Sequence, residues 1–212
     1  MMDLNRNVIL PSVFFGPVFY YHKAANAGIV FIEGFEHYIK QTYRNRCIIL
    51  GANGPLPLIV PVENGRRPRQ LIRDIRIAYH TPWQRNHWRS ILSAYRNSPF
   101  FDYYASDIEP FFRNHFTYLF DYNIEILYKT LDLLHLRPEI RITTGFETAD
   151  GDFDNFREAI TPKRQAQDVI NSYNPATYTQ VFEDKFPFVP DLSILDLLFC
   201  KGNEAAELLQ ES

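Results

Sequence analysis

The sequence predicts an α/β fold in which a mixed sheet, with an N-terminal β-α-β unit and a hairpin, is covered by helices. Three observations predict this class. Apolar runs at 8–15 and 29–32 flank a helix-compatible segment, which is the pattern of two parallel strands joined by a helix. Two apolar runs within 46–62 flank the turn-forming residues 51–54, Gly-Ala-Asn-Gly, as in a β-hairpin. Apolar residues then recur at helical spacing between 81 and 136.

The N-terminal unit begins with VILPSVFF at 8–15, which we expect to be a buried strand. Gly16 and Pro17 break this run, and proline suits the first turn of the helix that we expect to run to about Asn26. Gly28 closes that helix, so the apolar run that follows it is expected as the second strand.

The segment after the hairpin is basic and then strand-like. Residues 63–69 contain a proline and several arginines, so we expect an exposed loop. LIRDIRIAY at 71–79 is expected as a strand whose inward positions are Leu71, Ile75 and Ile77.

The remaining elements are expected to be helices, because their apolar residues recur every three or four positions. The predicted helices span 82–95, 107–115, 121–136 and 193–202. Thr81 and Ser193 have the side chains that cap helix N-termini, and Gly202 suits a helix end. Residues 138–165, which are rich in acids, are expected as a long loop.

The length and charge pattern indicate one folding unit over residues 1–212, since single cores commonly grow to about 200 residues. Residues 1–100 hold 13 Lys or Arg against 5 Asp or Glu, whereas residues 101–212 hold 9 against 20. We therefore expect a basic α/β half and a mostly helical acidic half. A local basic region in an acidic protein favours a small anionic partner over a nucleic acid. Mutual attraction of the two halves explains the same pattern equally well.

The cysteines and histidines indicate a protein without a metal site or disulfide framework. Cys47 and Cys200 are the only cysteines and are far apart, as expected for a cytoplasmic protein. The six histidines have no metal-binding spacing, so we predict no metal. The chain also lacks a run of about 20 apolar residues, so no membrane span is expected. No GxSxG, Walker-type or GxGxxG pattern is present, which leaves any cofactor undefined.

The segment EGFEHYIKQTYRNRC at 33–47 is the strongest candidate binding site. It follows a predicted parallel strand, and ligands of open α/β sheets collect at the carboxyl ends of strands. Lys40, Arg44 and Arg46 supply positive charge for an anion, and Asn45 with Tyr43 supplies orienting hydrogen bonds. The alternative is that Glu33 and Glu36 in the same segment form structural ion pairs with these cations, and the sequence leaves both interpretations open.

Two residues are candidate catalytic groups. His87 lies one helical turn from Trp83 and titrates near neutral pH when exposed, so it is a candidate general base. Glu36 is the other candidate for proton transfer. Packing of His87 against its aromatic neighbours is the commoner role for such a histidine.

Five segments together resemble the WbqC-like family of bacteria. They are PSVFFGPVFYYHKA, IEGFEHYIKQTYRNRCII, LIVPV, HWRSILSAYRNSPFFDYY and FPFVPDLSILDLLFCKG. The residues that match the family pattern are Lys40, Arg44, Asn45, Arg46, His87, Trp88, Tyr95, Ser98, Pro99, Ser193 and Asp196. The resemblance implies a role in surface-glycan or related metabolism and leaves the reaction undefined.

Two functions from different classes fit the residues and the resemblance. The first is a transferase acting on an anionic glycan precursor, such as a sugar nucleotide or an acyl donor. The second is a noncatalytic binding or scaffold protein for glycan-biosynthesis enzymes. Its partner would be another protein or a second copy of the chain.

Overall fold

A four-stranded parallel sheet forms one part of the protein. The computed structural model describes residues 6–63, 69–147, 152–162 and 176–210 of the 212-residue chain. The strands are β1 (Val8–Pro11), β2 (Ile29–Glu33), β5 (Glu139–Ile142) and β6 (Asp154–Asn155), in the order β5-β2-β1-β6. Every residue of β1 is buried, as expected for a strand with parallel neighbours on both sides.

The predicted β-α-β unit is confirmed. β1 and β2 flank helix α1 (Val18–Ala25) and pair in parallel, with Val8 opposite Val30 and Pro11 opposite Glu33. The first strand is shorter than expected, since it ends at Pro11 and Phe15 has a φ of 40°, outside the extended region.

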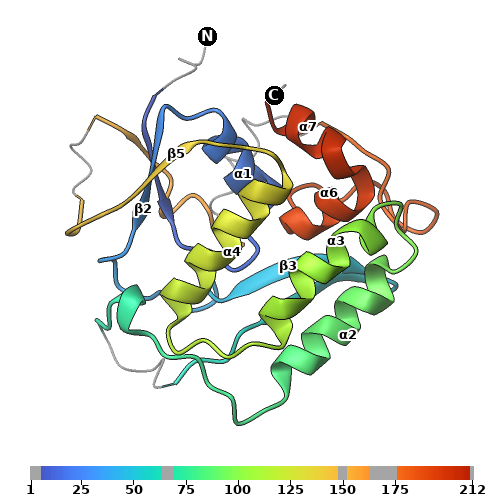
Figure 1. The fold of residues 1–212 in the computed structure, drawn as a ribbon, viewed down its shortest axis with the longest axis horizontal. Coiled ribbons are helices and arrows are strands. Elements are labelled where there is room, and N and C mark those ends of the chain that lie inside the picture. The colour runs from blue at the N-terminus through green and yellow to red at the C-terminus, as the bar shows by residue number, and fades with distance from the viewer. Residues whose placement is uncertain (1–5, 64–68, 148–151, 163–175, 211–212) are drawn as a thin grey trace.

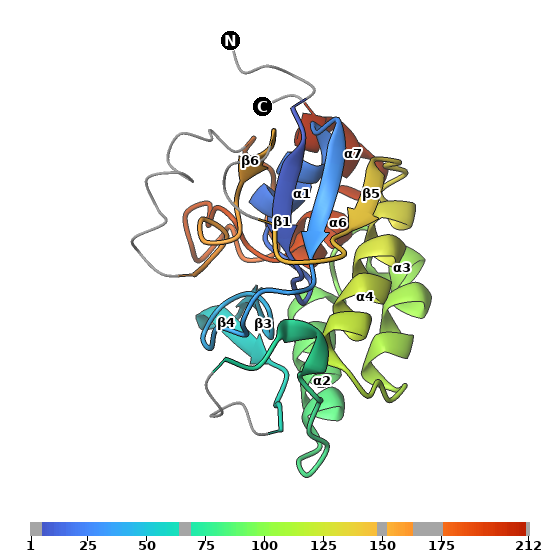
Figure 2. The same cartoon turned by 90° about the vertical axis from the view of Figure 1, so that its left-hand side faces the viewer.

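The predicted hairpin is also confirmed, and it forms a second sheet of its own. β3 (Arg46–Gly51) pairs antiparallel with β4 (Gly54–Ile59). Gly54 has a φ of 105°, a conformation that glycine adopts without strain. Figure 2 shows β2 running toward this hairpin, so the carboxyl end of the parallel sheet faces it.

Helices surround both sheets (Figure 1). They are α2 (Trp83–Tyr95), α3 (Phe101–Ile108), α4 (Leu119–Leu133), α6 (Ile194–Lys201) and α7 (Ala205–Gln210), with the 3₁₀ turns η1 (Ile72–Asp74), η2 (Glu109–Phe112) and η4 (Gly202–Glu204). Helices α6 and α7 pack against α1, whereas α2 and α6 contact β3. The α/β class, with helices covering parallel and antiparallel strands, is therefore as the sequence predicts.

The strand expected at 71–79 is wrong. Its first residues form η1, and Leu71 and Ile77 make only isolated bridges, to His37 and Val62 respectively. The buried residues Ile72 and Ile75 are three positions apart, which is the period of a 3₁₀ turn. The alternating pattern at the end of the segment concealed this spacing.

The other differences concern element boundaries. Helix α3 begins at Phe101 and ends at Ile108, where Pro110 opens η2, so the predicted helix at 107–115 is wrong. The helix expected at 121–136 is confirmed as α4. The expected loop at 138–165 contains the short strands β5, in which two isoleucines alternate with charged residues, and β6, which is polar. Parts of this segment lie outside the described residues. Residues 64–68 of the loop predicted at 63–69 also lie outside them.

Candidate functional site

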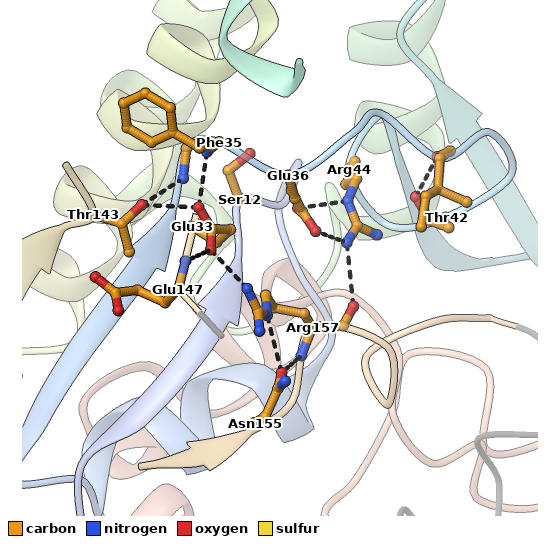
Figure 3. Close-up of polar contacts among 12 residues, drawn as sticks. Ser12, Glu33, Phe35, Glu36, Thr42, Arg44, Thr143, Glu147, Asn155 and Arg157 are labelled. Carbon is orange, nitrogen blue, oxygen red and sulfur yellow. Dashed lines mark hydrogen bonds and ion pairs between the residues drawn. The ribbon is translucent and has the colours of Figure 1, made fainter. Parts of the chain in front are cut away.

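Buried charged residues meet at the carboxyl end of the parallel sheet (Figure 3). Glu33 is the last residue of β2, Thr143 follows β5, and Arg157 follows β6. The sheet extends from β1 in one direction through β2 to β5, and in the other direction to β6. Such a reversal of strand order is where open α/β sheets bind ligands.

Glu33 is fully buried, and four groups surround its carboxylate. Arg157 Nη1 donates to Oε2 over 2.7 Å, and the Thr143 hydroxyl donates to Oε1 over 2.9 Å. The backbone N–H groups of Phe35 and Glu147 donate to the same carboxylate over 2.8 and 3.2 Å. This pairing satisfies Glu33, so the residue joins β2 to the segments that follow β5 and β6.

Arg44 and Glu36 form a second buried ion pair beside the first. Arg44 Nε donates to Glu36 Oε1 over 2.7 Å, and Nη2 donates to Oε2, so the contact is bidentate. Burial raises the pKa of the Glu36 carboxyl, and the Arg44 guanidinium opposes that shift. Arg44 Nη2 also donates to the backbone carbonyl of Arg157 over 3.2 Å, which links the two pairs. For Arg44 and Glu36, the structure therefore agrees with the alternative that the carboxylates of this segment form structural ion pairs with its cations.

Lys40, Asn45 and Arg46 line one cavity of about 290 Å³, which we call the basic pocket. Its other lining residues are Tyr38, Gln41, Ile59 and Val62. Within the described part of the chain, neither Lys40 nor Arg46 forms an ion pair. These two cations are therefore available to an anion, unlike Arg44.

Two of the residues that line the basic pocket have a buried polar atom without a partner among the described residues. The Asn45 amide nitrogen donates to the Val60 carbonyl over 2.8 Å, which orients the side chain. Asn45 Oδ1 and Arg46 Nε are buried and have no hydrogen-bond partner among the described residues. Unsatisfied buried polar atoms are rare in proteins and are often found at binding sites. The arrangement offers an anionic ligand two positive charges, on Lys40 and Arg46.

Tyr38 is a further residue of this pocket that the sequence did not single out. Burial raises the pKa of its phenol to about 12, and the Arg46 guanidinium opposes that shift. The hydroxyl therefore stays protonated at neutral pH and can donate a hydrogen bond.

His87 lies in an aromatic cluster and lines none of the three cavities described here. The ring centroids of Trp83, Phe14 and Phe112 lie 5.2, 6.2 and 6.4 Å from that of His87. Burial lowers the pKa of His87 to about 4, so the ring is neutral at pH 7. The structure thus separates His87 from the residues predicted to bind the anion.

Tyr43 lines a different cavity of about 200 Å³, which we call the Asp191 pocket. The remaining lining residues are Ile48, Pro55, Thr161, Pro162, Val189, Pro190, Asp191 and Leu192. Burial raises the pKa of the Asp191 carboxyl to about 7, although the carboxylate accepts a 2.8 Å hydrogen bond from the Phe19 N–H. Sequence reasoning missed Asp191, because its distance along the chain from Tyr43 gives no local signal.

A third cavity, of about 400 Å³, lies beside the ends of β2 and β5. Gly34, Phe35, Arg73, Phe120, Ile142, Thr143 and Thr144 line it. The Arg73 guanidinium lies 4.7 Å from the centre of the Phe35 ring, a cation–π contact.

Ser193 and Asp196 have structural roles. Ser193 caps α6 by accepting a hydrogen bond from the Leu195 N–H, as predicted. Asp196 is fully buried and accepts hydrogen bonds from the hydroxyls of Tyr95 and Tyr178, each over 2.8 Å. Gln180 also donates to it over 3.0 Å, so Asp196 fixes the segment that precedes α6.

No group of three or more His, Cys, Asp or Glu side chains among the described residues could hold a metal ion. Over the same residues, no helix has the length and apolar character needed to cross a membrane.

Comparison with known proteins places the sequence in a family. An uncharacterised protein of Mycobacterium tuberculosis (strain ATCC 25618 / H37Rv) is 25% identical over 209 residues, covering 86% of this chain and 90% of that protein. No solved structure matches the chain. A model of the WbqC-like protein family matches residues 12–180, a range that includes the basic pocket and both buried ion pairs. The chain belongs to the WbqC-like protein family.

Proposed function

We propose that the protein binds an anionic small molecule in the basic pocket and acts as a transferase on it. The substrate class is an anionic glycan precursor or a nucleotide-linked donor. One observation carries the proposal: Lys40 and Arg46 line the same cavity as Asn45, and neither cation is paired with a carboxylate in the described chain. Cations in a partly enclosed pocket are worth more to an anionic ligand than cations on an open surface.

The buried ion pairs support the proposal because they hold the chain that carries the pocket residues in place. Asn45 and Arg46 directly follow Arg44, whose bidentate contact with Glu36 fixes this part of the chain. A site held by such contacts loses less conformational entropy when a ligand binds. We therefore assign Arg44 and Glu36 the role of positioning the pocket residues.

We do not extend the proposal to proton transfer by Glu36 or His87. Both oxygens of Glu36 contact Arg44, and His87 lies among aromatic rings outside the lining of the basic pocket.

A thermal-shift screen tests the proposal. The probes are sugar nucleotides, nucleoside triphosphates, coenzyme A and inorganic pyrophosphate, each with wild type, Lys40→Gln and Arg46→Gln. A ligand at about 100 times its Kd stabilises the native state by about 2.7 kcal/mol, which raises Tm by roughly 5–10 °C in a protein of this size. We expect at least one probe to give such a shift in wild type and a much smaller one in both variants.

The control is Arg89→Gln, which removes one positive charge from the exposed side of α2 and should leave the shift unchanged. If no anion stabilises wild type, or if all three variants lose the shift equally, the proposal is wrong.

A noncatalytic binding or scaffold protein is the second candidate, favoured by a different observation. Ile39, Leu56 and Ile59 are large apolar residues that are 39–41% exposed, on β4 and in the segment before β3. Exposed apolar groups of this kind often contact partner proteins. Recovery of a stoichiometric partner in a pulldown, lost on Leu56→Ser and Ile59→Ser, together with a negative anion screen, would favour this function.

A further inference from the structure

The Asp191 pocket holds a carboxylate that pairs with no cation of the described residues. Asp191 Oδ1 accepts a hydrogen bond from the Phe19 N–H over 2.8 Å, at the start of α1. Across the described residues, no Lys, Arg or His forms an ion pair with this carboxylate, and Oδ2 has no hydrogen-bond partner. Asp191 is half-buried, and a carboxylate that is partly shielded from water is more costly to keep ionised than an exposed one unless a positive group lies beside it.

The surroundings of Asp191 are those of a small binding site. Thr161 lines the same cavity, and its hydroxyl oxygen is buried with no partner among the described residues. The other walls are mainly apolar, formed by Ile48 and Pro55 of the hairpin segment and by Val189, Pro190 and Leu192. The volume of about 200 Å³ is below the range of roughly 300–1,000 Å³ that is usual for drug-sized ligands. The cavity therefore suits a small body that is largely apolar.

Backbone strain at the same residue supports a role beyond folding. Asp191 has a φ of 56°, in the left-handed region that non-glycine residues seldom occupy. Such conformations cost free energy and concentrate at functional sites.

We propose that the Asp191 pocket binds a small primary amine, whose ammonium group lies beside the Asp191 carboxylate and whose apolar body lies against Ile48 and Val189. The ammonium group supplies a counter-charge that none of the described residues provides. Burial holds the pKa of Asp191 near 7 in the free protein, and a neighbouring ammonium would favour its ionised form.

The position of the pocket relates this amine to the proposed function. Tyr43 lines the Asp191 pocket and Asn45 lines the basic pocket, so their Cα atoms are at most about 7 Å apart along the chain. If the basic pocket holds an anionic donor, the amine is its acceptor: the ammonium gives one proton to the Asp191 carboxylate, and its nitrogen bonds to the transferred group as the bond from that group to the anionic leaving group breaks. The leaving group stays beside Lys40 and Arg46, and the second proton of the nitrogen goes to solvent. That reading as acceptor rests on the proposed function, whereas binding of the amine itself does not.

Matched probes test the proposal. Cyclohexylamine and cyclohexanol share an apolar body and differ in the ammonium group. We expect wild type to bind the amine about tenfold more tightly than the alcohol at pH 7.5, the ratio that one hydrogen bond between charged groups provides. The binding is measured by titration of backbone amide signals in NMR spectra, where the residues that shift should include Thr161 and Leu192.

Asp191→Asn is the decisive variant, because asparagine caps helices as well as aspartate does and so keeps the contact with Phe19. We expect it to lose the preference for the amine, while Lys40→Gln/Arg46→Gln keeps it. Equal binding of the two probes to wild type, or an unchanged preference in Asp191→Asn, would overturn the proposal. The proposal would also be overturned if the amine left the amide signals of wild type unchanged, or if the signals that moved belonged to residues away from the pocket.

Failure of this test is distinguishable from failure of the proposed function. The amine titration depends on Asp191 and not on Lys40 or Arg46, and the anion screen depends on Lys40 and Arg46 and not on Asp191.

Discussion

Buried charges at the carboxyl end of the sheet decide which residues of the basic segment can reach a ligand. Glu36 and Arg44 are eight residues apart, and their pairing was one of two alternatives that the sequence left open. Glu33 and Arg157 are 124 residues apart, so no local pattern could predict that pair. Both pairs are buried, and each buried charge is tolerated only because an opposite charge lies beside it.

Loss of one member of a buried pair should therefore be costly. Glu36→Gln leaves the Arg44 charge buried without a counter-charge, and we expect it to lower the free energy of unfolding by about 3–5 kcal/mol. Urea denaturation followed by circular dichroism measures this change. Glu139→Gln is the control, because its pair with Arg141 is more than half exposed and should contribute less than about 1 kcal/mol. Equal losses would show that Glu36 does not carry a buried charge.

His87 should make stability depend on pH. Burial lowers its pKa to about 4, from about 6.5 in the unfolded chain, so between these values the unfolded chain binds a proton that the folded protein does not. Stability is therefore fully present above pH 6.5 and decreases as the pH falls toward 4, by about 3 kcal/mol for this residue.

The prediction compares pH profiles of stability. His87→Gln should remove this part of the decrease, whereas His80→Gln, at an exposed position, should leave the profile unchanged. Denaturation midpoints measured from pH 7.5 to 4.5 provide both profiles. Parallel profiles for wild type and His87→Gln would mean that His87 titrates normally in the folded state.

At the scale of elements, the sequence predicted the helices and strands that are marked by patterns of neighbouring residues. The β-α-β unit, the hairpin, α2 and α4 follow from turn residues and apolar periodicity, and the structure contains all four. β5 and β6 could not be predicted, because they are four and two residues long, mostly polar, and ordered by pairing with distant strands. The sequence did not predict η1, because Ile75 and Ile77 alternate as in a strand and this concealed the spacing of three between the buried residues Ile72 and Ile75.

The end of α6 gives a prediction at this scale. Gly202 has a φ of 57°, and a Cβ at this position would overlap the ring of Phe100. Gly202→Ala should thus reduce stability by at least about 2 kcal/mol, through backbone strain and overpacking. Gly145→Ala is the control, since a Cβ there meets no atom within 4 Å. Thermal unfolding of both variants measures the difference, and equal Tm values would contradict this account of the helix end.

At the scale of the whole molecule, the division into a basic and an acidic half only partly explains the ion pairs. Arg6 pairs with Asp154 across the two halves, but Arg157 of the acidic half pairs with Glu33 of the basic half. The sequence places Lys40, Asn45 and Arg46 on one segment, and these three residues line one pocket. Their role in binding an anion stays a prediction. The burial of Arg44, the separate position of His87 and the presence of Asp191 depend on long-range packing.

Direct binding of an anionic ligand tests the central claim, that Lys40 and Arg46 form an anion site. Isothermal titration calorimetry, with the most stabilising probe from the screen, compares wild type with two double variants of equal net charge. Lys40→Gln/Arg46→Gln removes both pocket cations, and Arg85→Gln/Arg89→Gln removes two exposed cations of α2.

The account predicts that the pocket variant binds at least about tenfold more weakly, a loss of about 1.4 kcal/mol, whereas the α2 variant binds as wild type does. Equal weakening of both variants, or no weakening of the pocket variant, would contradict it.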